Sequence, residues 1–353
     1  PDNGWTADWQ IIPEKEKVIK NLKKAAKQVD HIYLATDLDR EGEAIAWHLK
    51  EALGPEKYSY SRVRFNQITK SAIIDSFADP KEIDLDLVKA YRARRFLDKV
   101  IGFELSPLLW KKIARGLSAG RVQSVALRVL DERERLIQEF IPEEFWEVSM
   151  ILDKNDLSIP FSLNRKKSDP LLKESEARNI ENLVNDSDLS IDEIIKKSVK
   201  VKPRPPFITS TLQQAASTKL SFGVKRTMRV AQKLYEAGHI TYMRTDAPSL
   251  SKESIQDARN FINERIGERY LTNAPRIYSS TENAQEAHEA IRPTNAFMTV
   301  DDLLNQTEEE KRLYQLIWQQ YIACQMPDAE YLSTSAKINA VSYTHLTLPT
   351  TSP

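Results

Sequence analysis

The stretch Thr36-Asp-Leu-Asp-Arg-Glu-Gly-Glu-Ala-Ile-Ala-Trp-His48 decides how the amino-terminal part of this chain folds. A short apolar run at residues 32–35 precedes it and predicts a buried strand. A helical pattern follows, because Ile45, Leu49 and Leu53 fall on one helix face. The sequence therefore predicts a strand, an acidic turn and a helix, as in an α/β sheet.

Three acidic side chains occupy alternate positions in that turn, namely Asp37, Asp39 and Glu41. Open α/β sheets bind their ligands at the carboxyl ends of strands, where this turn lies. Carboxylate oxygens suit Mg²⁺ there, since this ion takes one or two carboxylates and keeps positions open for phosphate oxygens. We expect a Mg²⁺ site here, although the spacing alone is equally consistent with a solvated acidic loop.

The chain is long enough for several domains. Its 353 residues exceed one ordinary domain, so two to four domains are expected. The hydrophobic content of 41% supports real cores, while no apolar run reaches the length of a membrane span and no signal peptide opens the sequence. The single cysteine, Cys324, excludes an internal disulfide and a cysteine-based zinc site, and it fits a reducing cytoplasm.

Basic residues are concentrated in one part of the chain, although the formal net charge is zero. Residues 89–128 hold ten basic residues against two acidic ones, Asp98 and Glu104. Binding to a phosphate backbone requires such local basic density, and neutrality of the whole chain does not cancel it. The basic residues are Lys89, Arg92, Arg94, Arg95, Lys99, Lys111, Lys112, Arg115, Arg121 and Arg128.

The amino-terminal patterns favour a parallel sheet followed by helices. A helix is expected over residues 14–29, a second strand over 62–65 and a helix over 69–77, which is a βαβ-type succession. From residue 84 the pattern is helical, with an interruption at Pro107.

A small-residue turn at residues 116–124 opens a further helix that runs to about residue 140. The first-turn amides of that helix and Arg121 could hold a phosphate, although such turns are also plain connectors.

Beyond residue 140 the chain changes character twice. Alternation over residues 146–161 predicts antiparallel strands, and the proline-rich run 199–206 predicts a hinge. Two helices are then expected, one at residues 209–219 that is capped by Thr209 or Ser210 and ended by Gly223, the other at 224–237. Such a pair around a glycine turn resembles a helix-turn-helix module. A last helix is expected over residues 308–325.

Residues 239–246 are expected to be extended, so that Tyr242 and Arg244 project to the same side. Tyrosine has an ordinary pKa of about 10, so one that attacks phosphate needs a cation nearby. Arg244 can bind the same phosphate in bidentate fashion. Taken alone, Tyr242 is more typical of a packed strand tyrosine than of a nucleophile, and His288 is also consistent with a surface histidine on a short helix.

Gln232 and Glu236 are four residues apart and share a helix face close to this segment. Glu236 could instead simply pair with Lys233 or Lys225 on the helix surface.

Five segments, in order, resemble the bacterial type IA DNA topoisomerases over roughly residues 9–340. The form Ile-Thr-Tyr-Met-Arg-Thr favours the topoisomerase I branch over the topoisomerase III branch, which usually has proline between the tyrosine and the arginine. The segments are Asp37-Leu-Asp-Arg-Glu-Gly-Glu43 of a toprim metal site, Gly116-Leu-Ser-Ala-Gly-Arg-Val-Gln-Ser124, Pro206-Phe-Ile-Thr-Ser-Thr-Leu-Gln-Gln214, Tyr242-Met-Arg-Thr-Asp246 and Ala287-His-Glu-Ala-Ile-Arg-Pro293.

The resemblance implies ATP-independent relaxation of negatively supercoiled DNA through a transient 5′-phosphotyrosine. Tyr242 would be the nucleophile, with Arg244, Glu236 and His288 as further catalytic residues. Mg²⁺ would be held by the three acids of the turn. The partner would be a single-stranded segment of DNA, and the protein a monomer in the cytoplasm, associated with the nucleoid. The implied DNA-binding residues are Arg62, Arg94, Asp98, Arg121, Gln123, Gln232 and Thr245.

The sequence also departs from the family pattern. Members begin with a strand bearing a Val-Glu-Ser-Pro-like motif followed by a lysine, and residues before Trp9 do not supply it. Gln67 stands where glutamate is usual, and Ala247 where serine is usual. Because further core and zinc modules are also missing after residue 340, we expect an internal fragment that binds single-stranded DNA weakly and does not complete relaxation.

The expected fold is multidomain, α/β plus mainly α. The domains are a toprim-type parallel-sheet domain lacking its first strand at 1–83, a helical basic DNA-channel domain at 84–140, a β-rich arch and hinge at 141–206, a helix-turn-helix-like domain carrying the tyrosine at 207–328, a return strand to the arch at 329–340 and a non-native tail at 341–353. The alternatives are a topoisomerase III-like or reverse-gyrase module, another toprim enzyme such as a primase or nuclease, and a non-catalytic module that binds single-stranded DNA.

Overall fold

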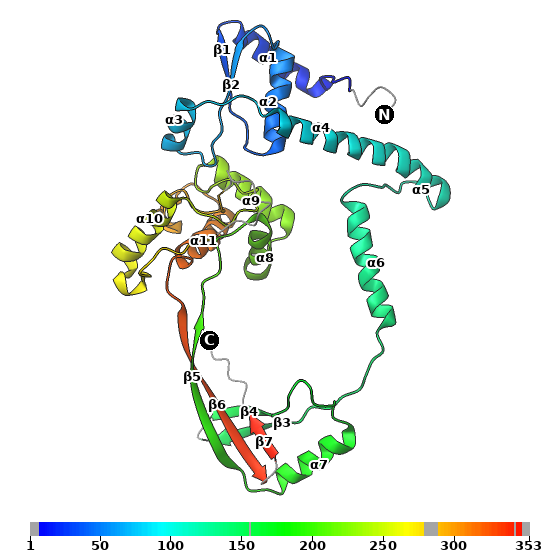
Figure 1. The fold of residues 1–353 in the computed structure, drawn as a ribbon, viewed down its shortest axis with the longest axis vertical. Helices are drawn as coiled ribbons and strands as arrows, with labels where there is room; N and C mark the ends of the chain where they lie inside the picture. The colour runs from blue at the N-terminus through cyan, green and yellow to red at the C-terminus, as the bar shows by residue number, and fades with distance from the viewer. Residues whose placement is uncertain (1–6, 155–156, 279–288, 342–343, 348–353) are drawn as a thin grey trace. The chain divides into compact units, whose positions relative to one another are not determined.

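The computed structural model describes residues 7–154, 157–278, 289–341 and 344–347 (Figure 1). The chain divides into two compact units, which are described separately. The first comprises Pro1–Val129 and Pro203–Pro327, and the second Leu130–Lys202 and Asp328–Pro353.

The first unit begins with a small parallel sheet flanked by helices. Strand β1 (His31–Leu34) pairs in parallel with β2 (Ser59–Arg62), so the predicted parallel sheet is confirmed. The second strand was expected over residues 62–65 but lies at 59–62. Its four residues pair one by one with the four residues of β1. The helices are α1 (Pro13–Ala26), α2 (Arg40–Leu53) and α3 (Lys70–Ala78).

A long helical segment follows in the same unit (Figure 1). Helix α4 (Leu85–Val100) continues through a π-helical turn (Ile101–Leu105) into α5 (Ser106–Lys112). Pro107 lies in the first turn of α5, directly after the π-helical turn, so the helical path bends locally there but does not end at the interruption that the sequence predicted. Helix α6 (Gln123–Glu139) comes next, and its residues from Leu130 onward belong to the second unit.

The rest of the first unit is a helical bundle with a well-buried core. Leu212, Leu234, Ile240 and Leu313 have no exposed surface and pack in one cluster. The expected helices at 209–219, 224–237 and 308–325 are present within a few residues. They are α8 (Thr209–Leu220), α9 (Val224–Glu236), α10 (Lys252–Phe261) with a π-helical turn (Ile262–Ile266), two short 3₁₀ turns (Glu268–Tyr270 and Val300–Asp302) and α11 (Glu308–Ala323).

Three local predictions in this region were wrong. The N-cap of α8 is Ile208, because the hydroxyl of Thr209 bonds elsewhere. Helix α8 ends at Ser221 in the left-handed region, φ 56°, whereas Gly223 is the N-cap of α9. Residues 239–246 form no regular strand; Ile240 makes a single β-bridge, to Pro293.

The second unit contains the carboxyl-terminal part of α6 from Leu130 onward, an antiparallel sheet and helix α7 (Glu174–Asn185). The strand order is β3-β4-β7-β6-β5, and the small core is centred on Phe161 and Ile338. The predicted non-native tail at 341–353 stays a prediction; its residues 344–347 form β7. The strands are β3 (Ser149–Lys154), β4 (Leu157–Leu163), β5 (Ser190–Val201), β6 (Ala329–Val341) and β7 (Thr344–Thr347).

None of the helices in the described ranges is both long enough and apolar enough to span a membrane.

Candidate active site

The acidic turn folds back tightly on the first turn of α2. Asp39 is the N-cap of α2, and its Oδ1 accepts a hydrogen bond from Gly42 N at 2.8 Å. A Cβ on Gly42 would lie 2.2 Å from the carbonyl oxygen of Asp37, so only glycine fits there. The hydroxyl of Thr36 donates to Gly42 O at 2.6 Å. The sequence of this turn therefore gives the acidic residues a defined geometry.

Arg62 holds the other side of the turn and is fully buried. Its guanidinium donates to the carbonyl oxygens of Leu34, Thr36, Val63 and Asp37 at 2.6–2.9 Å. The predicted DNA-binding role of Arg62 is therefore corrected, because a side chain with no exposed surface and with its donors engaged internally cannot reach a bound strand.

Tyr242 and Arg244 meet at one oxygen of the acidic turn. The phenol of Tyr242 donates to Asp39 Oδ2 at 2.6 Å, and Arg244 Nη1 lies 3.5 Å from the same oxygen. Burial, and then the hydrogen bond to Asp39, raises the pKa of Tyr242 far above its ordinary value. The phenol is thus protonated near neutral pH. The prediction that both side chains project to one side agrees with this geometry, although loop rather than strand provides it.

Side chains from α8 brace the loop that carries Tyr242. The hydroxyl of Thr209 donates to the carbonyl oxygens of Met243 and Thr245, at 2.8 and 3.0 Å, and accepts from Thr245 N at 3.0 Å. Thr245 is buried, and its own hydroxyl accepts from Ala247 N. Thr245 thus shapes the loop through its backbone and hydroxyl.

An open cleft of about 630 Å³ lies beside Asp39 and Arg244. Its lining combines cations with small polar groups, which suits a phosphate and an attached sugar. The prediction missed Ser210 and Gln213 as lining residues. Both residues belong to the segment 206–214, which resembles the family but from which no individual site residue was predicted. The full lining is Asp39, Arg40, Glu41, Arg94, Ile208, Thr209, Ser210, Gln213, Arg244, Thr245 and Asp246.

Two ion pairs occupy predicted residues near the cleft. Glu41 Oε1 lies 3.1 Å from Arg94 Nη1. Arg121 pairs with both carboxylate oxygens of Asp98, and this hydrogen bonding lowers the pKa of Asp98. These cations are partly exposed, so a bound strand could exchange for their carboxylate partners.

Of the remaining predicted residues, Glu236 lies close enough to the acidic turn for its charge to help raise the pKa of Asp37, after burial and the charge of Asp39. Gln232 Nε2 donates to Glu236 Oε1 at 2.7 Å, whereas Lys233, the alternative partner of Glu236, pairs with Glu310. Gln123 lies at the start of α6, where its amide donates to Ser118 at 3.3 Å. His288 lies outside the described residues.

The acidic turn fits a metal ion bound by few carboxylates. Burial, and then the charge of Asp39, raises the pKa of Asp37, which indicates carboxylates that lack a full complement of positive charge. Within the described ranges, however, no three acidic, histidine or cysteine residues converge on one point, since Glu41 turns to Arg94. Asp37 and Asp39 match the one or two carboxylates that Mg²⁺ needs.

Known proteins resemble the chain over nearly its full length. Residues 82–349 match the DNA topoisomerase family, and residues 5–68 match the toprim domain, a metal-binding domain. DNA topoisomerase 1 of Vibrio cholerae is 51% identical over 98% of this chain, and that of Escherichia coli 50% over 96%. The chain spans about 40% of the length of these relatives.

A solved structure agrees with this likeness. Full-length topoisomerase I from Thermotoga maritima superposes with a TM-score of 0.80 at 35% identity, over 97% of this chain and 56% of that one. The acidic turn, the tyrosine facing it and the family match over residues 82–349 lead to one conclusion: this chain belongs to the bacterial type IA DNA topoisomerase family.

Proposed function

We propose that this chain carries the strand-cleaving site of a topoisomerase that relaxes negatively supercoiled DNA without ATP. The observation that supports this most directly is the meeting of Tyr242 and Arg244 at Asp39 Oδ2. A nucleophile, a cation and a proton acceptor then lie together beside a cleft with further cations.

The proposed cleavage is an exchange of one phosphodiester for another. The phenol oxygen of Tyr242 attacks phosphorus, forming a 5′-phosphotyrosine bond as the bond to the 3′ oxygen breaks. Asp39, which already accepts the hydrogen bond of the phenol, is placed to take its proton. The 3′ oxygen leaves as a hydroxyl after gaining a proton from water in the open cleft, and resealing reverses both proton transfers.

Charge on the phosphate is neutralised by the cations of the cleft. Arg244 binds the attacked phosphate, and Arg94 lies where a neighbouring phosphate would run. We propose Asp37 and Asp39 as the principal holders of Mg²⁺, with Glu41 joining when Arg94 turns to DNA. When bound, the ion supplies positive charge beside the phosphates during resealing.

Covalent trapping tests the proposal. A single-stranded oligonucleotide labelled at its 3′ end is incubated with the chain joined to the amino-terminal strand of the family pattern, and quenched with denaturant. Label on the protein is expected, because a 5′-phosphotyrosine retains the downstream fragment. Tyr242→Phe should abolish the adduct. Tyr235→Phe is the matched control, since its ring lies 5.2 Å from that of Tyr242.

The alternatives give different results in the same assay. A toprim nuclease or primase would leave no tyrosine adduct, and a non-catalytic module would show salt-dependent binding without cleavage. Since the chain spans about 40% of its relatives, we assign strand passage to the longer protein in the cytoplasm. Full relaxation of a plasmid by the 353 residues alone would contradict that division.

A further inference from the structure

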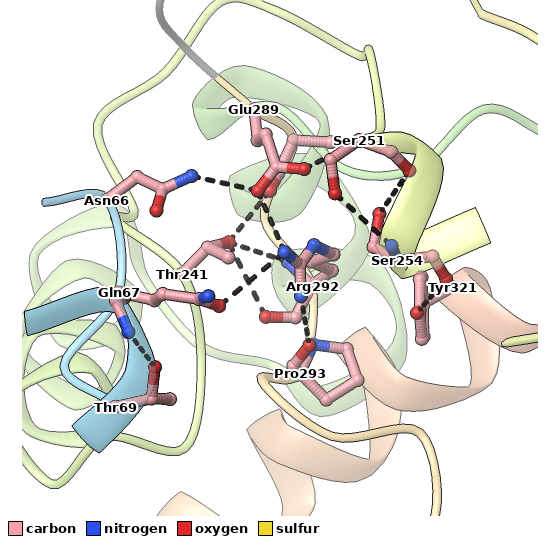
Figure 2. A network of polar contacts seen from close by, with 12 residues as sticks. Asn66, Gln67, Thr69, Thr241, Ser251, Ser254, Glu289, Arg292, Pro293 and Tyr321 are labelled. Atoms are coloured by element: carbon pink, nitrogen blue, oxygen red, sulfur yellow. Dashed lines mark hydrogen bonds and ion pairs between the residues drawn. The ribbon is translucent and has the colours of Figure 1, made fainter. Parts of the chain in front are cut away.

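A buried polar network joins the loop after β2 to the segments around Tyr242 (Figure 2). Its centre is Glu289, whose side chain is 13% exposed. Glu289 Oε2 accepts from Asn66 Nδ2 and from Arg292 Nη2, each at 2.8 Å, while Oε1 accepts from Ser251 N at 2.6 Å. Asn66, like its neighbour Gln67, comes from the toprim part of the chain.

Arg292 is the second anchor of the network, with 5% of its surface exposed. Its Nη2 reaches Gln67 Oε1 at 3.5 Å, and its Nη1 donates to Pro293 O at 3.0 Å. Among the residues that the structure describes, its buried Nε has no hydrogen-bond partner. The hydrogen bond to Gln67, at 3.5 Å, is long. Arg292 Nε is still able to donate a further hydrogen bond.

The same network fixes the backbone of the nucleophile. Tyr242 N donates to the carbonyl oxygen of Asn66 at 2.8 Å. The preceding residue, Thr241, donates through its hydroxyl to Ala290 O at 2.7 Å and accepts from Arg292 N at 3.0 Å. A displacement of the Asn66 loop therefore removes one of the bonds that hold Tyr242 opposite Asp39.

The contacts are arranged so that the loop can leave without stranding a charge. The ion pair of Glu289 and Arg292 lies wholly within the tyrosine-bearing part and stays intact on separation. Within the network, separation withdraws the side-chain amides of Asn66 and Gln67 and the Asn66 carbonyl that accepts from Tyr242 N, all neutral groups whose hydrogen bonds water can replace at modest net cost. The long contact of Arg244 with Asp39 also opens, but the side chain of Arg244 is 58% exposed and remains solvated. Breaking a buried ion pair would instead be strongly unfavourable.

We propose that Asn66 and Gln67 are positioning residues that form a releasable latch on the Glu289–Arg292 pair, holding Tyr242 at Asp39 when closed and letting the toprim and tyrosine-bearing parts separate when open. The inference rests on the proposed function, because separation serves an enzyme that opens a gate for strand passage. Gln67 sets the strength of the latch: a carboxylate at this position would add a charge and a second acceptor oxygen for Arg292.

The latch can be measured without DNA or activity. Spin labels are attached to Glu51→Cys on α2 and Glu253→Cys on α10, both exposed positions, since the only native cysteine, Cys324, is buried. Asn66→Ala should raise the ratio of separated to joined molecules about tenfold, the effect of one hydrogen bond to a charged group. Gln67→Glu should lower that ratio.

Matched controls come from α10, where Gln256 and Asn260 are exposed and bond only to each other. Asn260→Ala and Gln256→Glu repeat the two changes away from the network and should leave the distance distribution unchanged. If Asn66→Ala fails to fold, Gln67→Glu against Gln256→Glu decides. Distances that match the controls would overturn the latch.

A positioning role also predicts how cleavage changes. Asn66→Ala should slow adduct formation about tenfold at saturating oligonucleotide while DNA affinity stays within about twofold, since the network faces Tyr242 and not the cleft. Adding Gln67→Glu should restore part of the rate. An unchanged rate in Asn66→Ala, with the adduct still abolished in Tyr242→Phe, would reject the latch and leave the proposed function standing.

Discussion

Arg62 Nε lies 2.9 Å from Glu43 Oε2, and neither side chain has any solvent-exposed surface. The pair ties β2 to α2, while the rest of the guanidinium holds carbonyl oxygens of the acidic turn. Glu43 also accepts from Arg64 and from Asp84 N. The geometry of Asp37 and Asp39 thus depends on a charge pair that DNA does not touch.

Removing one partner of this pair should destabilise the protein strongly. Glu43→Gln leaves the buried guanidinium of Arg62 without its carboxylate, at a cost of about 3–5 kcal/mol in unfolding free energy. Arg62→Met should be comparably costly, because it removes the donor to four carbonyl oxygens and leaves Glu43 with the ion pair to Arg64. Thermal and urea unfolding measure the change. Arg178→Met, which breaks an exposed pair with Glu174, is the control and should cost less than about 1 kcal/mol. Equal effects of the two arginine substitutions would refute a structural role for Arg62.

The hydroxyl of Thr209 should matter more than a neighbouring one on the same helix. Thr209→Val leaves buried groups of Met243 and Thr245 unpaired, so a loss of about 1–3 kcal/mol is expected in urea unfolding. Thr218→Val is the matched control, because its hydroxyl bonds only Gln214 O within α8. If both variants unfold at the same urea concentration, Thr209 does not brace the tyrosine loop.

Magnesium binding should depend on the two carboxylates of the turn. Titration calorimetry with MgCl₂ is expected to show binding that Asp37→Asn and Asp39→Asn each weaken about tenfold or more, through the loss of a ligand charge. Chelation by EDTA should lower the melting temperature of the native protein only. Asp131→Asn, on the exposed face of α6, is the control. Native affinity in both active-site variants would place the ion elsewhere.

The network around Glu289 should weaken in acid. Burial by itself would raise the pKa of Glu289, but Arg292 and the hydrogen bonds from Ser251 hold it below the ordinary value of 4.5. The unfolded chain therefore binds the proton more readily, so this stabilisation is complete above pH 4.5 and is lost as pH falls through the lowered pKa. Below the lowered pKa of Glu289, the distribution of distances between the two spin labels should become broader. Glu289→Gln should remove this acid response; persistence of the response would assign it to another group.

The affinity for DNA should depend less steeply on salt concentration when Arg121 is removed. Arg121→Ala is expected to reduce the slope of log affinity against log salt by about 0.7–1, the value for one phosphate contact. Arg135→Ala, whose partner on α6 is Asp131, should leave the slope unchanged. Fluorescence anisotropy with a labelled oligonucleotide measures both. Identical slopes would remove Arg121 from the binding surface.

The sequence predicted best what short-range patterns determine. The acidic turn between β1 and α2 follows from an apolar run, alternating carboxylates and helical spacing, all within a few residues. The hydrogen bond of Tyr242 with Asp39 spans 203 residues and was not predicted; the resemblance to the family implied a role for each residue but no contact between them.

What failed depended on long-range burial. From the sequence, Arg62 was predicted to bind DNA. The structure shows instead that its guanidinium donates to backbone carbonyl oxygens inside the protein. The latch of Asn66 and Glu289 joins residues 223 positions apart, with no periodic signal in either segment. Thr209 was taken for a helix cap because threonine favours that place, whereas its hydroxyl bonds a loop that sequence could not place nearby.

Strand β5 has consequences for handling the protein. It lies at the edge of its sheet, and all twelve of its residues are exposed. An edge strand of this length is a template for pairing with another chain, and lysines oppose such pairing through charge repulsion. The positive charges of Lys196, Lys197 and Lys200 therefore oppose aggregation through this edge. Replacing them with apolar residues would be expected to increase aggregation through pairing of β5 with other chains.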